Sequence, residues 1–219
     1  MFISKKRVVG TLAVTIGLIG LATSIQANAK TTFEDYYAVT TKATKALPKG
    51  TRVQVYRTAT KNGKQFASVD VSRLSYEVQK RAGNKYSVVI ATANLKKVAT
   101  PASDKLTVLA KGAKYTTEAR YKATNKLKVT TDGYVQYFAN SFQKAPISST
   151  KLTASRAKGN IVYLYSKTNM AKLPDKHIHK HGNYQYRLAI RDNQKQDELS
   201  QSYSVGTLKN LFYLPTLKA

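Results

Sequence analysis

The sequence predicts an all-β protein, made of small units of antiparallel strands joined by hairpins. Short runs rich in valine, threonine and tyrosine alternate with polar residues, which is typical of half-buried antiparallel strands. Helical periodicity is weak along the chain. Residue pairs that favour tight turns separate the strand-like runs, so neighbouring runs are expected to pair with each other.

The first 29 residues have the three parts of a secretory signal peptide. Cationic residues 5–7 precede an uncharged apolar run over 8–25, and an A-x-A motif at 27–29 supplies a cleavage site. Three glycines interrupt the apolar run, which favours a removable signal; an uncleaved N-terminal anchor is the alternative. We therefore expect export, with no stable membrane span once residues 1–29 are removed.

A Lys-Gly pair stands before a strand-like run at three places, with its glycine at Gly50, Gly112 and Gly159. Glycine adopts positive φ angles that other residues resist, so each pair predicts a turn that feeds a strand. The runs that follow are TRVQVYR, AKYTTEAR and NIVYLYSK. We interpret the three segments as a degenerate repeat.

Each Lys-Gly segment is followed by a hairpin signal. The turn pairs are Asn62-Gly63, Asp132-Gly133 and Gly182-Asn183. The first and third units also end alike, because 93–98 and 206–211 share a small-polar-Leu-Lys-polar-aliphatic pattern. We expect each of these endings to be a final strand that pairs back on the first strand of its unit.

Residues 70–82 allow two interpretations. Leu74, Tyr76 and Val78 alternate as in a strand, which we prefer. The alternative is a short helix with Asp70 as its cap and Val71, Leu74 and Val78 facing inward.

Two proline-containing stretches, around Pro101 and Pro146, are candidate linkers. They divide the expected mature chain into a unit over 30–100, a short unit over 101–145 and a unit over 146–219. The short unit is too small to form a stable hydrophobic core without disulfide bonds, so we expect it to pack against the unit that follows.

The segment ALPKGTRVQVYRTATKNGKQFASV, closed by NKYSVVIATANLKKV, resembles bacterial SH3-like cell-wall-binding modules and the wall-anchoring modules of lactobacillal surface-layer proteins. The matching features are the turn at 47–50, the valine-alternating strand through Val53 and Val55, and the turn at 62–63. Many SH3-like modules carry a tryptophan that this chain lacks, and Phe66 stands nearest its place. The resemblance implies two to three small SH3-like barrel units and non-covalent binding to the wall.

Positive charge dominates the chain that remains after export. Removal of residues 1–29 takes away three cations and no acid, so the formal net charge falls from +26 only to +23. This charge exceeds what solubility requires and concentrates polyanions near the protein. At a Gram-positive cell surface the abundant polyanions are teichoic and related wall polymers. We expect these as partners, with other surface proteins as further partners and no specific nucleic acid; a membrane-active or nucleic-acid-binding cation is another option.

The chain has no cysteine, which excludes a lipoprotein anchor, disulfide bonds and the thiol nucleophile of papain-like peptidases. There is no G-x-S-x-G motif, and no dispersed histidine set for a zinc amidase. We expect no enzyme and no cofactor. The alternative is a secreted wall hydrolase or effector whose catalytic carboxylates come from acids such as Glu34, Asp35, Asp70, Glu77 and Glu118.

All three histidines lie together, as His177, His179 and His181. On one strand they share a face, so they are weak candidates for a zinc or copper site. Lys176 and Lys180 repel a cation, so a solvated basic hairpin arm is the preferred interpretation and no metal is expected.

Basic residues interleaved with tyrosine are the candidate contacts for a polyanion. Lysine and arginine neutralise phosphates, while tyrosine rings pack on sugar faces. The candidates are Lys49, Arg52, Tyr56, Arg57, Lys111, Arg120, Tyr121, Lys122, Lys158, Tyr186 and Arg187. The sequence thus predicts a secreted, strongly basic surface protein that binds an anionic wall polymer of the teichoic acid type.

Overall fold

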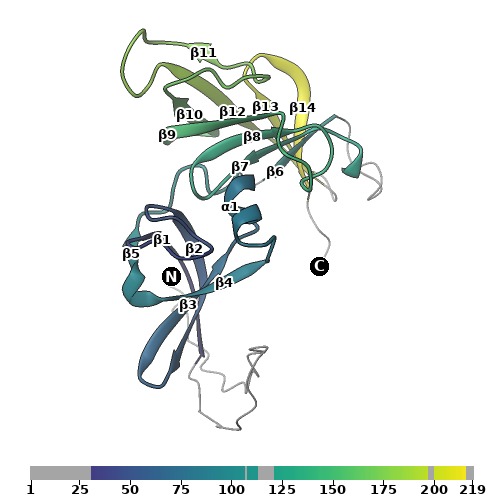
Figure 1. The fold of residues 1–219 in the computed structure, drawn as a ribbon. Coiled ribbons are helices and arrows are strands. Elements are labelled where there is room, and N and C mark those ends of the chain that lie inside the picture. Colours follow the sequence, from purple (N-terminus) through teal and green to yellow (C-terminus); the bar gives the residue numbers. More distant parts are fainter. Residues whose placement is uncertain (1–30, 107, 113–120, 197–199, 216–219) are drawn as a thin grey trace, which may run out of the picture.

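The computed structural model describes residues 31–106, 108–112, 121–196 and 200–215, and within them the protein is all-β, as the sequence predicts (Figure 1). The predicted signal peptide, residues 1–29, lies outside these ranges. The strands form two antiparallel sheets, called sheet A and sheet B below. No helix within the described ranges has the length and apolar composition that crossing a membrane requires.

Sheet A, at the bottom of Figure 1, has five strands in the order β4-β3-β2-β1-β5. Its core includes Leu47, Val53, Val55, Val69 and Ile90, all buried. The valine alternation of β2 therefore points one set of side chains inward, as predicted. The strands are β1 Thr31–Thr40, β2 Arg52–Lys61, β3 Lys64–Asp70, β4 Ser87–Ala91 and β5 Leu95–Val98.

The predicted closure of sheet A is confirmed. The short 3-10 helix η1, Thr92–Asn94, leads into β5, and β5 pairs antiparallel with β1. The turn between β2 and β3 has φ angles of 51° at Asn62 and 70° at Gly63, the mirror-image turn that tight hairpins use. Gly50 has a φ of 80° just before β2, as the Lys-Gly pattern predicts.

The preference for a strand over 70–82 is wrong, because the helix α1 spans Tyr76–Arg81. Asp70 does not cap it; its carboxylate accepts hydrogen bonds from the backbone and hydroxyl of Ser72. The residue before the helix is Ser75, whose backbone N–H and hydroxyl both donate to the carboxylate of Asp132 in the other half of the molecule. A long-range contact thus fixes the start of this helix, and the local alternation of apolar residues could not reveal it.

Sheet B, in the upper part of Figure 1, has nine strands in the order β10-β9-β8-β7-β6-β14-β13-β12-β11. An additional pairing joins β10 to β12. The hydrogen-bonded pairs between the described strands therefore run around the sheet from β10 to β12 and close on β10 again. The strands are β6 Val108–Lys111, β7 Lys126–Val129, β8 Tyr134–Phe138, β9 Ser148–Lys158, β10 Ile161–Ser166, β11 Lys176–His177, β12 Tyr186–Gln196, β13 Ser200–Val205 and β14 Leu208–Pro215.

The hairpins expected at Gly133 and Gly182 join β7 to β8 and β11 to β12. Gly159 has a φ of 57° between β9 and β10. Gly112 also has a positive φ, but it follows β6, and the strand expected over 113–120 lies outside the described residues.

The segments 101–145 and 146–219 contribute strands to one sheet and side chains to one core. Position 146 falls in the connection between β8 and β9, which pair with each other. The ending over 206–211 enters β14, which pairs with β13 and β6. The expectation that it pairs back on the first strand of its own unit is therefore wrong. A shared core supplies the buried apolar surface that a segment of this size cannot gather alone.

Candidate polyanion-binding surface

The outer side of β9, β10 and β12 brings arginine and tyrosine side chains together. In the strand registers, Tyr163 lies opposite Arg156, and Tyr165 lies opposite Arg187. Leu164, between the two tyrosines, is fully buried. Because side chains alternate across a strand, these tyrosines and arginines point away from the core.

The rings and guanidinium groups on this side contact one another. The guanidinium carbon of Arg187 lies 5.1 Å from the ring centroid of Tyr163. That of Arg156 lies 5.8 Å from the ring of Tyr165 and 5.4 Å from the ring of Tyr184. The two rings meet edge to face at 5.4 Å. We call these five residues, Arg156, Tyr163, Tyr165, Tyr184 and Arg187, the arginine–tyrosine face.

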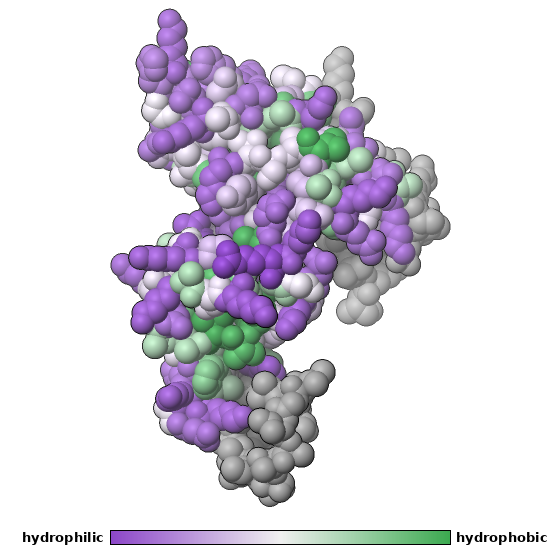
Figure 2. All heavy atoms as spheres, viewed as in Figure 1, coloured by the Kyte–Doolittle hydropathy of each residue, from purple (hydrophilic) through white to green (hydrophobic). Residues whose placement is uncertain are grey.

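The charges of this face are not neutralised by nearby acids. Among the described residues, the side-chain ion pairs join Arg73 to Asp104 and Lys97 to Glu34, and neither involves the face. Lys158 and Arg191 flank it, since both lie opposite Ile161. Figure 2 shows hydrophilic residues over most of the visible surface, interrupted by a hydrophobic patch on the part that sheet A builds. The face can therefore offer two arginine side chains, held over aromatic rings, to an anion.

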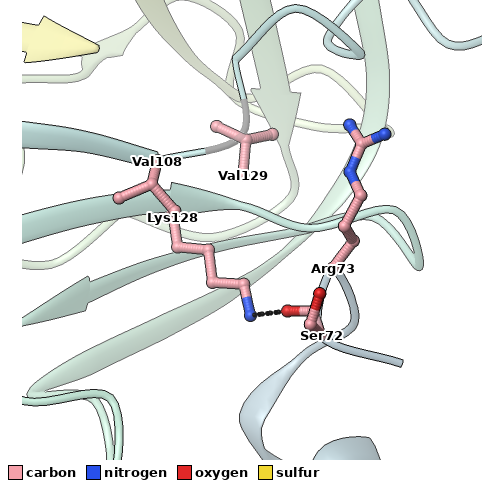
Figure 3. A pocket seen from close by; sticks show the side chains of 5 residues that line it. All are labelled: Ser72, Arg73, Val108, Lys128 and Val129. Carbon is pink, nitrogen blue, oxygen red and sulfur yellow. Dashed lines mark hydrogen bonds between the residues drawn. The ribbon is translucent and has the colours of Figure 1, made fainter. Parts of the chain in front are cut away.

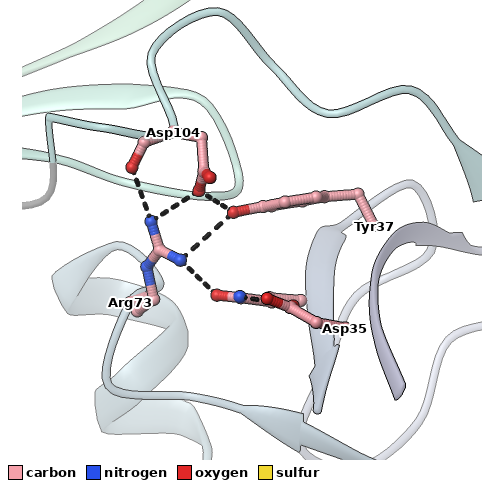
Figure 4. A network of polar contacts seen from close by, with 5 residues as sticks. Asp35, Tyr37, Arg73 and Asp104 are labelled. Atoms are coloured by element: carbon pink, nitrogen blue, oxygen red, sulfur yellow. Dashed lines mark hydrogen bonds and ion pairs between the residues drawn. The ribbon is translucent and has the colours of Figure 1, made fainter. Parts of the chain in front are cut away.

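A second cluster of basic residues lies at the junction of the two sheets, where segment 72–75 meets sheet B. Arg73 forms an ion pair of 2.8 Å with Asp104 and donates to the hydroxyl of Tyr37 and to Gln54 (Figure 4). The Tyr37 hydroxyl donates to Asp104. Burial, and then this hydrogen bond, raise the pKa of Tyr37 above its usual value. The charge of Arg73 is thus compensated within the protein.

Lys128 on β7 is the most buried cation of the junction, with 6% of its surface exposed. Its amine donates to the carbonyl oxygen of Ser72, at 2.7 Å (Figure 3), and to that of Leu74, at 2.9 Å. Burial lowers the pKa of Lys128 to about 8, although Asp132 and Asp70 oppose the shift. The lysine therefore ties the loop before α1 to sheet B.

The structure does not bring all the predicted contacts to one surface. Arg187 belongs to the arginine–tyrosine face, and Lys158 flanks it. The ring of Tyr186 instead packs on His177, with centroids 4.8 Å apart.

The remaining predicted contacts lie elsewhere, and Arg120 is outside the described residues. Lys49 is exposed in the turn before β2, which carries Arg52, Tyr56 and Arg57 in sheet A. The guanidinium of Arg57 lies 3.4 Å from the hydroxyl of Ser68. Lys111 ends β6, Lys122 follows Tyr121, and the Tyr121 ring lies 4.7 Å from the amine of Lys126.

Sequence reasoning missed Arg156, Tyr163, Tyr165 and Arg191, and it left Tyr184 out of the predicted contacts although Tyr184 stands in the run Tyr184-Gln185-Tyr186-Arg187. The sequence did carry a signal for Arg156, Tyr163 and Tyr165, because Gly159 predicts the turn between the two strands that hold them. Counting outward from that turn places Arg156 opposite Tyr163, with Tyr165 on the same side. Tyr184 lies in a local run of tyrosine and arginine, and it reaches the face from the loop after β11.

The three histidines do not form the shared strand face that was expected, since β11 contains only Lys176–His177. All three side chains are exposed. Across the described ranges, no three histidine or acidic side chains come together as a metal site.

Three of the acids considered for catalysis, Glu34, Asp35 and Asp70, are engaged in contacts with other side chains. Glu34 lies 3.9 Å from Lys97, and Asp35 accepts a hydrogen bond of 2.6 Å from Gln54. Glu118 is outside the described residues.

Comparisons with the models of known protein families, with curated proteins and with solved structures find no match for this chain.

Proposed function

We propose that the protein is a secreted, strongly basic surface protein that attaches non-covalently to an anionic cell-wall polymer of the teichoic acid type, at the surface of a Gram-positive bacterium. The arginine–tyrosine face is the observation that carries this proposal. Its arginines have aromatic neighbours and no ion-pair partner among the described residues, so their charge is available to a ligand.

The chemistry of the face suits a polymer of phosphates joined by polyols or sugars. A guanidinium group can donate two parallel hydrogen bonds to one phosphate. Tyrosine rings offer flat apolar surfaces to the carbon atoms between phosphates. Arg156 and Arg187 lie on strands on either side of β10 and are offset by two residues along it, so their backbones are ~12 Å apart. One flexible chain can reach both.

Sheet A supports the proposal that the N-terminal unit is an SH3-like wall-binding module. Its five strands end with β5 paired on β1, and its Lys-Gly turn feeds β2. The amine of Lys97 lies 4.3 Å from the ring centroid of Tyr36. This is a single cation–aromatic contact, whereas the arginine–tyrosine face has several. We propose that this unit adds a weaker contact to the same polymer.

Binding to purified walls, with and without their teichoic acid, tests the proposal over a series of salt concentrations. We expect the double variant Arg156→Gln/Arg187→Gln to bind intact walls at least tenfold more weakly. The matched control, Lys61→Gln/Lys64→Gln, also removes two charges, from the exposed tip of the β2–β3 hairpin. It should bind nearly as well as the unmodified protein.

Two outcomes would contradict the proposal. One is that binding survives removal of the polymer. The other is that both double variants lose the same affinity, since net charge alone would then explain binding. Clearing of wall material on a zymogram would favour a wall hydrolase with unrecognised catalytic carboxylates.

A further inference from the structure

A cavity of about 240 Å³ lies at the junction of the two sheets (Figure 3). It is lined by Ser72 and Arg73 from the loop before α1, Val108 from β6, and Lys128 and Val129 from β7. This volume equals that of about eight water molecules. Both halves of the molecule thus build the cavity wall.

Two cationic side chains of the cavity wall have hydrogen-bond donors left over. The Nε–H of Arg73 is buried and has no partner in the described part of the chain. The other guanidinium nitrogens of Arg73 are used by Tyr37, Gln54 and Asp104. Lys128 donates to two carbonyl oxygens, and an ammonium group has three N–H bonds. A buried donor without an acceptor is costly, so the cavity favours a ligand that accepts from the Nε–H of Arg73 and carries negative charge near Lys128.

The charge around the cavity also favours an anion. Asp132 and Asp70 favour the charged form of Lys128, whereas Arg73 opposes it, and burial outweighs all three. An anion beside Lys128 would supply the missing compensation. Val108 and Val129 supply an apolar part of the lining, which suits a molecule with a short hydrocarbon part.

We propose that this cavity binds a small oxyanion, a phosphate or carboxylate attached to a few carbon atoms, between Arg73 and Lys128. The site is distinct from the arginine–tyrosine face and does not depend on the wall-binding proposal. Its ligand can be a free small molecule or the end group of a wall polymer. Because residues from both halves line the cavity, the bound anion holds the two sheets together.

Titration with glycerol 3-phosphate and with propionate, followed by NMR of arginine Nε–H groups, tests the site. We expect the signal of Arg73 to shift and saturate with at least one probe. Lys128→Met should weaken this binding at least tenfold, and a rise from pH 6 to pH 9.5 should weaken it by a similar factor. Arg156→Gln/Arg187→Gln should leave it within twofold, which separates this site from the proposed function.

Saturation with a purified wall polymer, at the same concentration of end groups, would support the site and assign its ligand to the polymer end. Shifts that never saturate, or that are equal in Lys128→Met, would overturn the proposal. If Lys128→Met does not fold, Arg73→Lys decides, because it keeps a charge near Asp104 and lacks the Nε donor. Unchanged thermal stabilisation of Arg73→Lys by the probes would then overturn it.

Discussion

The junction and the arginine–tyrosine face use the same residue types for different purposes. At the junction, Arg73 and Lys128 lie among carboxylates and carbonyl oxygens, which accept most of their hydrogen bonds. On the face, Arg156 and Arg187 lie over tyrosine rings. Most donors of the junction cations thus hold the fold, whereas the arginines held only by rings keep theirs for a ligand.

Acidic residues decide which role a basic residue has, because they are scarce. The chain has 11 aspartates and glutamates against 37 lysines and arginines, so most cations cannot have an acidic partner. Asp104 and Asp132 both make junction contacts, and Asp70 acts on Lys128 there. Because these acids lie at the junction, they do not offset the basic residues elsewhere, and the electrostatic potential over the outer surface stays positive.

The largest expected effect comes from breaking the junction. Asp132 is buried and accepts hydrogen bonds of 2.9 Å and 2.5 Å from the backbone and hydroxyl of Ser75. Asp132→Ala leaves the donors of Ser75 without a partner and removes one of the two carboxylates that act on Lys128, so we expect a loss of ~3 kcal/mol in the free energy of unfolding. Urea denaturation measures this. A loss below ~1 kcal/mol would show that the junction contributes little to stability.

The pH dependence of stability tests the buried lysine. The pKa of Lys128 is about 8 in the folded protein and 10.5 ordinarily, so between these values the unfolded chain holds more protons. Stability therefore rises with pH here, by about 2 kcal/mol between pH 8 and pH 10. Above pH 10 it should fall, because burial raises the pKa of Tyr203 to about 12 and the folded state then holds more protons.

Lys128→Met is the control for this profile, because it removes the titrating amine while the net charge still falls with pH. Its unfolding free energy should rise less between pH 8 and pH 10. If the unfolding free energies of the unmodified protein and of Lys128→Met rise equally with pH, the rise comes instead from weaker repulsion among the protein's positive charges.

Conservative substitution on the face separates charge from geometry. Arg156→Lys/Arg187→Lys keeps both charges but loses the planar groups that stack on rings and grip phosphate. We expect about a threefold loss of affinity for intact walls, about 0.7 kcal/mol, against the tenfold loss expected for the glutamine pair. Equal losses in the lysine and glutamine variants would mean that stacking geometry alone matters. Unchanged unfolding in urea confirms that the face is not needed for folding.

The smallest effect is expected at the exposed ion pair of sheet A. Lys97 and Glu34 lie 3.9 Å apart, with 73% and 42% of their side chains exposed. Glu34→Gln should change the unfolding free energy by less than ~0.5 kcal/mol, since water screens such pairs. A change near that of Asp132→Ala would contradict the contrast between buried and exposed charges.

Much of the local structure could be predicted because short segments carry it. The hairpins at 62–63 and 132–133 follow from residues that tolerate positive φ, and the inward side of β2 follows from its alternating valines. The closing strand of sheet A was predicted from its pattern. The helix α1 was only the alternative to a preferred strand, because the residue before it, Ser75, is held by Asp132, 57 positions away.

The candidate site was predicted only in part. Arg187 and Lys158 were found because they lie beside tyrosine or glycine in the sequence. The contact between Arg156 and Tyr184 joins β9 to the loop between β11 and β12, which is remote in the sequence, so local patterns could not show it. The same holds for the cavity, which needs residues from both halves of the chain.

The amino-acid sequence by itself determined the all-β class, the principal turns and the large excess of positive charge, because these depend on local backbone preferences and on composition. Tertiary structure decided which charges are compensated. Pairing of β14 with β6 and of β9 with β8 joined two segments into one sheet, and the junction placed acids beside Arg73 and Lys128. Compensation depends on distances between side chains far apart in the sequence, and only the folded chain sets those distances.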